Sequence, residues 1–163
     1  MRYAALAALF GLIGAPALGR DSLGVFETWG AFRDPGVPRC YAIAMAQKPR
    51  GAKVDYQAYA DVAHWPKRAL RNQVHFRLSK RVLAKAPIRL SVGSQQFLLV
   101  GGGGDAWAAD RRMDAAIVAA MRSAMTMRLR ATAANGRGFS DSYALPGAAT
   151  AIDAAALGCA RAR

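Results

Sequence analysis

The residue types that most often carry chemistry in proteins are scarce in this chain. Its only histidines are His64 and His75, and no metal-binding motif is visible around either of them. His75 falls on the polar side of an alternating segment, where an exposed histidine needs no functional role. His64 comes at the end of another segment, shortly before Pro66. We therefore expect neither a metal site nor a catalytic histidine.

Other catalytic patterns are equally weak. Glu27 is the only glutamate, so the paired carboxylates of a glycosidase would have to come from scattered aspartates. Most of these aspartates fall at predicted turns or helix caps, where aspartate has ordinary structural roles: Asp34, Asp61, Asp105, Asp110 and Asp141. The serines lack the G-x-S-x-G context of an activated nucleophile. We expect a protein that is not an enzyme; the alternative is a hydrolase with a cleft near the two histidines.

A glycine run, Gly101 to Gly104, contains the one pattern that resembles a phosphate-binding loop. Gly101, Gly103 and Ala106 fit G-x-G-x-x-A. A dinucleotide-binding fold also needs a helix that starts at this point and an acid about 20 residues further on. Here the next predicted helix starts only near Asp110, and no acid stands near Met121. We expect a flexible connection at the glycine run, and no cofactor.

The first 19 residues have the pattern of a secretory signal peptide. Arg2 precedes an apolar run from Ala4 to Ala15, and Ala17-Leu18-Gly19 supplies small residues for cleavage before Arg20. The run is too short for a lasting membrane span. We predict a signal peptide over 1–19 and a single exported domain over 20–163, in the periplasm or on the outer surface. The alternative is a buried N-terminal helix.

Two cysteines, Cys40 and Cys159, are the only ones in the chain. In an exported protein the expected use of such a pair is a disulfide bond, which would tie the C-terminal region to an early strand. The alternative is two separate thiols.

Strands are the elements that must position all these residues. The region from 72 to 100 reads as the centre of one sheet, because Val74, Phe76 and Leu78 alternate with polar residues, as do Ile88, Leu90 and Val92. Further strands are predicted over 25–34, 39–46, 56–65, 125–134 and 139–145, and helices over 110–124 and 147–157. Asn135-Gly136 predicts a hairpin turn, and Gly158 is expected to end the last helix.

This pattern predicts a mainly β fold with six to eight, mostly antiparallel, strands. We expect an antiparallel β-sandwich or partly closed barrel with two short helices near the C-terminus. A ferredoxin-like α+β layer is the alternative.

The chain is strongly basic, with 23 Lys and Arg against 10 Asp and Glu and a formal net charge of +13. Such a charge attracts anionic surfaces without choosing among lipid headgroups, lipopolysaccharide and nucleic acid. Four arginines fall on outward positions of predicted strands and could form one basic sheet face: Arg77, Arg89, Arg128 and Arg130. No nucleic acid is expected, because aromatic residues do not interleave with these arginines. The alternative is an ordinary solvated face.

Several segments resemble one family of exported bacterial proteins, the invasion-associated locus B family. The resemblance rests on the signal peptide, on Trp29 followed by Arg39-Cys40-Tyr41, and on the ending from Asp114 through Asn135-Gly136 to the Ala-rich helix. Family members often carry more cysteines and a Pro/Gly-rich loop in the middle of the domain, which this chain lacks. The resemblance implies a periplasmic or surface-associated protein without established catalytic residues.

These observations together predict a non-catalytic, exported envelope or surface-associated protein. We expect it to bind an anionic component of the envelope or of a host surface through the arginine face, or else a protein partner. The alternatives are the hydrolase named above and a purely structural envelope protein whose charge is incidental.

Overall fold

The computed structural model describes residues 19–47, 51 and 55–160. Apart from Gly19, the predicted signal peptide lies outside the described residues. The N-terminal half of the described chain contains five strands: β1 (Asp21–Phe26), β2 (Trp29–Asp34), β3 (Arg39–Met45), β4 (Tyr59–Trp65) and β5 (Leu70–Arg77). A short 3-10 helix, η1 (Pro66–Arg68), joins β4 to β5.

The C-terminal half adds five strands and two α-helices. The strands are β6 (Ile88–Val92), β7 (Gln95–Gly102), β8 (Asp105–Trp107), β9 (Thr126–Thr132) and β10 (Gly138–Ala144). The helices are α1 (Arg111–Met121), between β8 and β9, and α2 (Ala148–Ala160), after β10.

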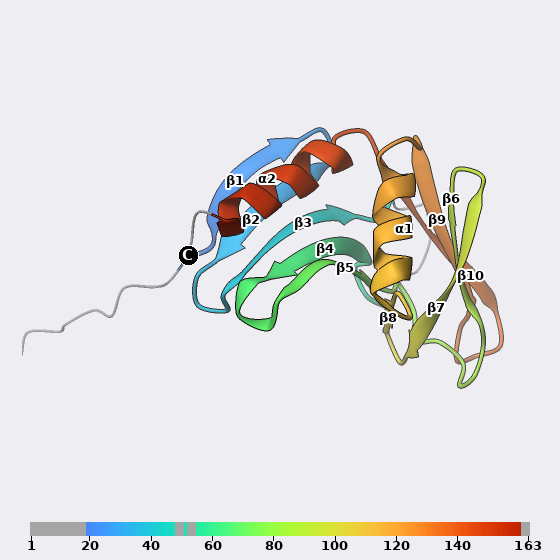
Figure 1. Cartoon of the computed structure of the whole chain (residues 1–163). Helices are drawn as coiled ribbons and strands as arrows, with labels where there is room; N and C mark the ends of the chain where they lie inside the picture. Colours follow the sequence, from blue (N-terminus) through green and yellow to red (C-terminus); the bar gives the residue numbers. More distant parts are fainter. Residues whose placement is uncertain (1–18, 48–50, 52–54, 161–163) are drawn as a thin grey trace, which may run out of the picture.

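All ten strands form one antiparallel sheet in the order β1-β2-β3-β4-β5-β8-β7-β6-β9-β10. The sheet bends, so that Gln47, just beyond β3, pairs with Ser142 of the far edge strand β10. It is nevertheless not closed into a barrel, because β1 and β10 do not pair in the part of the chain described. Figure 1 shows the two halves of the sheet on either side of α1. The predicted mainly β, sandwich-like fold with two C-terminal helices is confirmed.

The bend gives the sheet one core-facing side, which we call the inner face. Alternate residues of every long strand point into it, among them Ala42, Phe76, Leu90, Leu129 and Tyr143, all of them buried. The rings of Phe76 in β5 and Tyr143 in β10 lie 6.0 Å apart between centroids, so that the two halves of the sheet meet in one core. The residues between them in each strand form the opposite side, the outer face.

Helix α2 covers the inner face of β1 to β4, as Figure 1 shows. Its apolar residues Ala148, Ala151, Ile152 and Ala155 are buried there. The disulfide bond between Cys40 of β3 and Cys159 near the end of the helix confirms the predicted pairing. The end of α2 is therefore fixed covalently to an early strand.

Helix α1 packs against β5, β6 and β7 through Ile117, Val118 and Met121. Its N-terminus is capped by Asp110, whose carboxylate accepts a hydrogen bond from the backbone N–H of Met113 at 2.8 Å. Asp114 accepts a second hydrogen bond from the backbone N–H of Val74 at 2.8 Å. This bond ties α1 to β5 beyond the point where the short strand β8 ends.

Several details differ from the sequence predictions, beginning with the number of strands, which is ten where six to eight were expected. The predicted strand over 25–34 is a hairpin of β1 and β2, whose turn places Glu27 at a φ of 53°. The glycine run is not a flexible connection: Gly101 and Gly102 belong to β7, and Gly103-Gly104 turns the chain into β8. Helix α2 does not end at Gly158, where the lack of a side chain instead leaves room for Leu23 of β1.

We expect removal of the disulfide to destabilise the fold strongly. The bond joins residues 119 positions apart, and closing so long a loop contributes about 4–5 kcal/mol in the chain-entropy model. The double variant Cys40→Ala/Cys159→Ala should lose stability of this order in urea unfolding, and the reduced wild-type protein should match it. An unchanged free energy of unfolding would contradict the expectation.

Candidate functional site

The pairing register places three of the predicted arginines side by side on the outer face. Arg89 of β6 lies directly opposite Arg130 of β9, and Arg128 of β9 lies opposite Ser91 of β6. All three side chains are exposed. We call Arg89, Arg128 and Arg130 the arginine ladder.

No carboxylate accompanies the arginine ladder on its own strands. The only acid in β6, β9 and β10 is Asp141, which is buried on the inner face and accepts a hydrogen bond from the backbone N–H of Ser79 at 3.0 Å. Arg128 Nε donates to the hydroxyl of Ser142 at 3.1 Å. Like charges directly opposite each other in a sheet are destabilising, so the Arg89–Arg130 pair is a local cost to the fold.

Arg77 shares the outer face, but its surroundings differ. The register links it to the ladder through Asp105, Gly102 and Leu98, because paired residues and residues two apart in a strand share a face. Its Nη1 lies 2.7 Å from Asp105 Oδ2, and its guanidinium stacks 4.6 Å from the centroid of the Tyr56 ring. The positive charge of Arg77 is therefore largely matched within the protein.

His75 stands beside Arg77 in a cluster that the sequence does not reveal. Its Nδ1 lies 2.7 Å from Asp61 Oδ2 in β4, and its Nε2 lies 3.2 Å from Asp105 Oδ1 in β8. The ring of Trp107 packs against the imidazole, with centroids 5.1 Å apart. We call Asp61, His75, Arg77 and Asp105 the charged cluster.

The charged cluster favours a protonated His75. A neutral imidazole can donate only one hydrogen bond, whereas here both ring nitrogens face carboxylates. Burial by itself lowers the pKa of His75, but the hydrogen bonds and charges of Asp61 and then Asp105 outweigh it, and the pKa is raised above its ordinary value. With both nitrogens occupied, His75 has none free to exchange a proton with a substrate.

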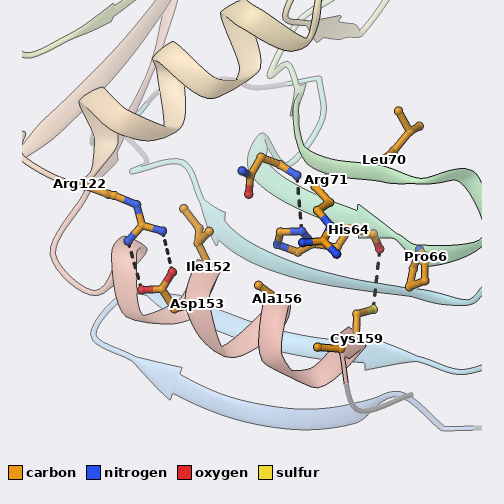
Figure 2. A pocket seen from close by; sticks show the side chains of 11 residues that line it. His64, Pro66, Leu70, Arg71, Arg122, Ile152, Asp153, Ala156 and Cys159 are labelled. Atoms are coloured by element: carbon orange, nitrogen blue, oxygen red, sulfur yellow. Dashed lines mark hydrogen bonds and ion pairs between the residues drawn. The ribbon is translucent and has the colours of Figure 1, made fainter. Parts of the chain in front are cut away.

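His64 lies on the other side of the sheet, so the structure does not bring the two histidines together. It pairs with Cys40 across β3 and β4 and lines a hollow of about 260 Å³ between the β4–β5 connection and α2. Figure 2 shows this hollow, with His64 and Arg71 facing Ile152 and Ala156 of the helix.

Some of the polar groups around this hollow are engaged, whereas His64 Nε2 is buried without a hydrogen-bond partner among the described residues. His64 Nδ1 accepts a hydrogen bond from the backbone N–H of Asn72 at 3.4 Å, and burial lowers the pKa of His64. At the rim, Arg122 forms a two-pronged ion pair with Asp153, at 2.6 and 3.1 Å. Asp153 is thereby occupied, and the hollow presents no free carboxylate beside His64 for acid–base catalysis.

Sequence reasoning located the four arginines and both cysteines but missed the partners of His75. Three of the aspartates expected at turns or caps instead lie within strands: Asp61 in β4, Asp105 in β8 and Asp141 in β10. The only available signal for Asp105 and Trp107 is a three-residue alternation after a glycine run, which is too short to predict a strand.

Within residues 19–47, 51 and 55–160, no group of three or more His, Cys, Asp and Glu side chains could hold a metal ion. No helix among these same residues is both long and apolar enough to cross a membrane.

The raised pKa of His75 predicts that the protein loses stability as pH rises above neutrality. A histidine with a raised pKa in the folded state stabilises the fold fully below its unfolded pKa of about 6.5, and this stabilisation is lost as pH rises through the folded pKa. For one proton the slope cannot exceed about 1.4 kcal/mol per pH unit. Urea unfolding over this range should show the fall in wild type and not in His75→Gln.

His64→Gln is the matched control for this experiment. Because burial lowers the pKa of His64, its titration affects stability below pH 6.5 and leaves the window above it unchanged. If His75→Gln kept the wild-type slope above pH 6.5, the assignment of a protonated His75 would be wrong.

Comparison with known proteins agrees with the resemblance seen in the sequence. The family model for invasion-associated locus B (IalB) protein matches residues 34–156, from the end of β2 to the last turns of α2. No curated protein and no solved structure matches the chain. The matched region holds β3 to β10, α1 and most of α2 and covers most of the sequence, so the chain belongs to the invasion-associated locus B family.

Proposed function

We propose that this protein is a non-catalytic, exported component of the cell envelope that binds an anionic partner through the arginine ladder. Its location is either the periplasm or the outer surface, in keeping with a family of exported proteins and with a disulfide bond between its only two cysteines. Membership of the invasion-associated locus B family supports an envelope protein of this type.

The observation that carries the proposal is the direct opposition of Arg89 and Arg130 without a carboxylate on their strands. An arrangement that costs stability in the free protein becomes favourable when an anion lies between the two guanidinium groups. Phosphate and carboxylate groups fit such planar, fork-like donors best. The serine hydroxyls of Ser91 and Ser142 flank the ladder as further hydrogen-bonding groups.

The net charge of +13 favours the same class of partner. Charge of this size raises the rate at which an anionic partner is encountered, and the effect weakens as salt screens it. Arg77 adds less, because Asp105 already matches its charge. Phosphorylated lipid or saccharide of the envelope is the class of partner that combines these properties.

We predict that Arg89→Gln/Arg130→Gln weakens binding to anionic targets. Each basic residue near an anionic surface is worth about 1 kcal/mol, so the pair should account for about 2 kcal/mol, or roughly thirtyfold in affinity, at low salt. The measurement is cosedimentation with lipopolysaccharide-containing vesicles, and titration with soluble polyphosphate, across a salt series. Neutral vesicles give the background.

The control variant is Arg111→Gln/Arg112→Gln, which removes the same charge from exposed positions on α1, the helix that packs on the inner face. It should bind nearly as well as wild type. The ladder variant should unfold at the same or a higher urea concentration than wild type, because it relieves the Arg89–Arg130 opposition. Equal losses of binding in the two variants, or no binding by wild type at low salt, would refute the proposal.

A further inference from the structure

Three large apolar side chains are exposed next to one another on the outer face. Leu98 and Val100 alternate with buried Leu99 on β7 and are 55% and 49% exposed. Trp107 of β8 is 38% exposed and lies directly opposite Val100. We call Leu98, Val100 and Trp107 the apolar stripe.

The apolar stripe adjoins the arginine ladder. Leu98 lies directly opposite Arg89, which in turn lies opposite Arg130, so three neighbouring strands carry a row of one apolar and two cationic side chains. At its other end the stripe meets the charged cluster, where Trp107 packs on His75. The charges of that cluster are paired with one another, so it presents little net charge beside the stripe.

Single exposed apolar residues on a protein surface need no explanation, but a contiguous group beside unmatched cations does. A soluble polyanion would make use of the arginines alone. A bilayer with anionic lipids would use both groups, because its phosphates lie at the depth of the arginines and its glycerol and upper acyl region accepts leucine, valine and tryptophan. Tryptophan is enriched at this depth in membrane proteins.

We propose that the outer face of β6, β7, β8 and β9 docks on an anionic lipid bilayer. In this arrangement Arg89 and Arg130 bind lipid phosphates, and Leu98, Val100 and Trp107 enter the interfacial region of the leaflet. The inference rests on the proposed function for the role of the arginines, and it adds that the anionic partner is a lipid bilayer. The long arginine side chains can keep their charged ends at the phosphates while the apolar side chains lie deeper.

The first test compares Leu98→Ser/Val100→Ser with Val25→Ser/Leu157→Ser, which makes the same two replacements at exposed positions on β1 and α2. Binding is measured to vesicles of equimolar phosphatidylcholine and phosphatidylglycerol, and to soluble polyphosphate. The stripe variant should bind the vesicles on the order of tenfold more weakly than wild type. In wild type the exposed half of each of the two apolar side chains leaves water on insertion, and the serine variant lacks this apolar surface. Its affinity for polyphosphate should be unchanged, and the control should match wild type on both.

The second test follows Trp107 directly. Its fluorescence should shift to the blue when the protein binds these vesicles, and lipids brominated near the top of the acyl chains should quench it. Trp107→Phe should lose both effects, because Trp29 is buried in the core and Trp65 lies at the far end of β4.

The outcomes separate this inference from the proposed function. Binding to polyphosphate without binding to vesicles, or vesicle binding that is equal in the stripe variant and wild type, overturns the bilayer inference alone. Binding of wild type to neither target overturns both. Loss of vesicle binding in the stripe variant with a wild-type urea unfolding curve supports insertion, since a misfolded variant would unfold earlier.

Discussion

Phe76 of β5 and Tyr143 of β10 meet in the core, and this contact joins a central strand of a long bent sheet to one of its edge strands. Because each strand alternates its side chains, the burial of one set on the inner face determines which residues remain on the outer face. The indole N–H of Trp29 in β2 donates to the backbone oxygen of Ala144 at 2.9 Å and ties β2 to the same edge strand. The packing of the core consequently determines which residues make up the outer face.

The inner face depends on α2 as well as on the strands. Much of the side of β1 to β4 that meets this helix is alanine, including Ala31, Ala42 and Ala44, and so few methyl groups bury little apolar area per residue. The disulfide between Cys40 and Cys159 compensates, because it stabilises the fold mainly by restricting the unfolded chain and does not need a large interface. A covalent bond at the end of an alanine-rich helix is thus a physically sensible arrangement in an oxidising compartment.

Local patterns in the sequence were sufficient to predict most of the elements. Alternation located β5 and β6, and Asn135-Gly136 identified the turn between β9 and β10. The turn between β1 and β2 was missed because it contains Glu27 at a positive φ in place of glycine or asparagine. Alternation also placed the arginines outward. The order of strands is not a local property, however, since β8 pairs between β5 and β7.

That non-local pairing explains why the surroundings of His75 could not be foreseen. Asp61, His75 and Asp105 come from three strands, 14 and 30 residues apart along the chain from the histidine, and only the register brings them together. The exposure of Leu98 and Val100 had a local cause, because four consecutive apolar residues from Phe97 to Val100 on one strand cannot all face the core. Their position beside Arg89 again required the strand order.

The outer face therefore combines two groups of charges with different electrostatic consequences. In the charged cluster, Asp61 and Asp105 face His75 and Arg77 at hydrogen-bonding distance, so their fields largely cancel beyond the cluster. In the arginine ladder the three charges add, and a flat anionic surface within about 8–10 Å, the screening length in physiological salt, would be attracted to that part of the face first. The apolar stripe lies between the two groups. An approaching surface would be oriented by β6 and β9, and β7 and β8 would then be the next strands to meet it.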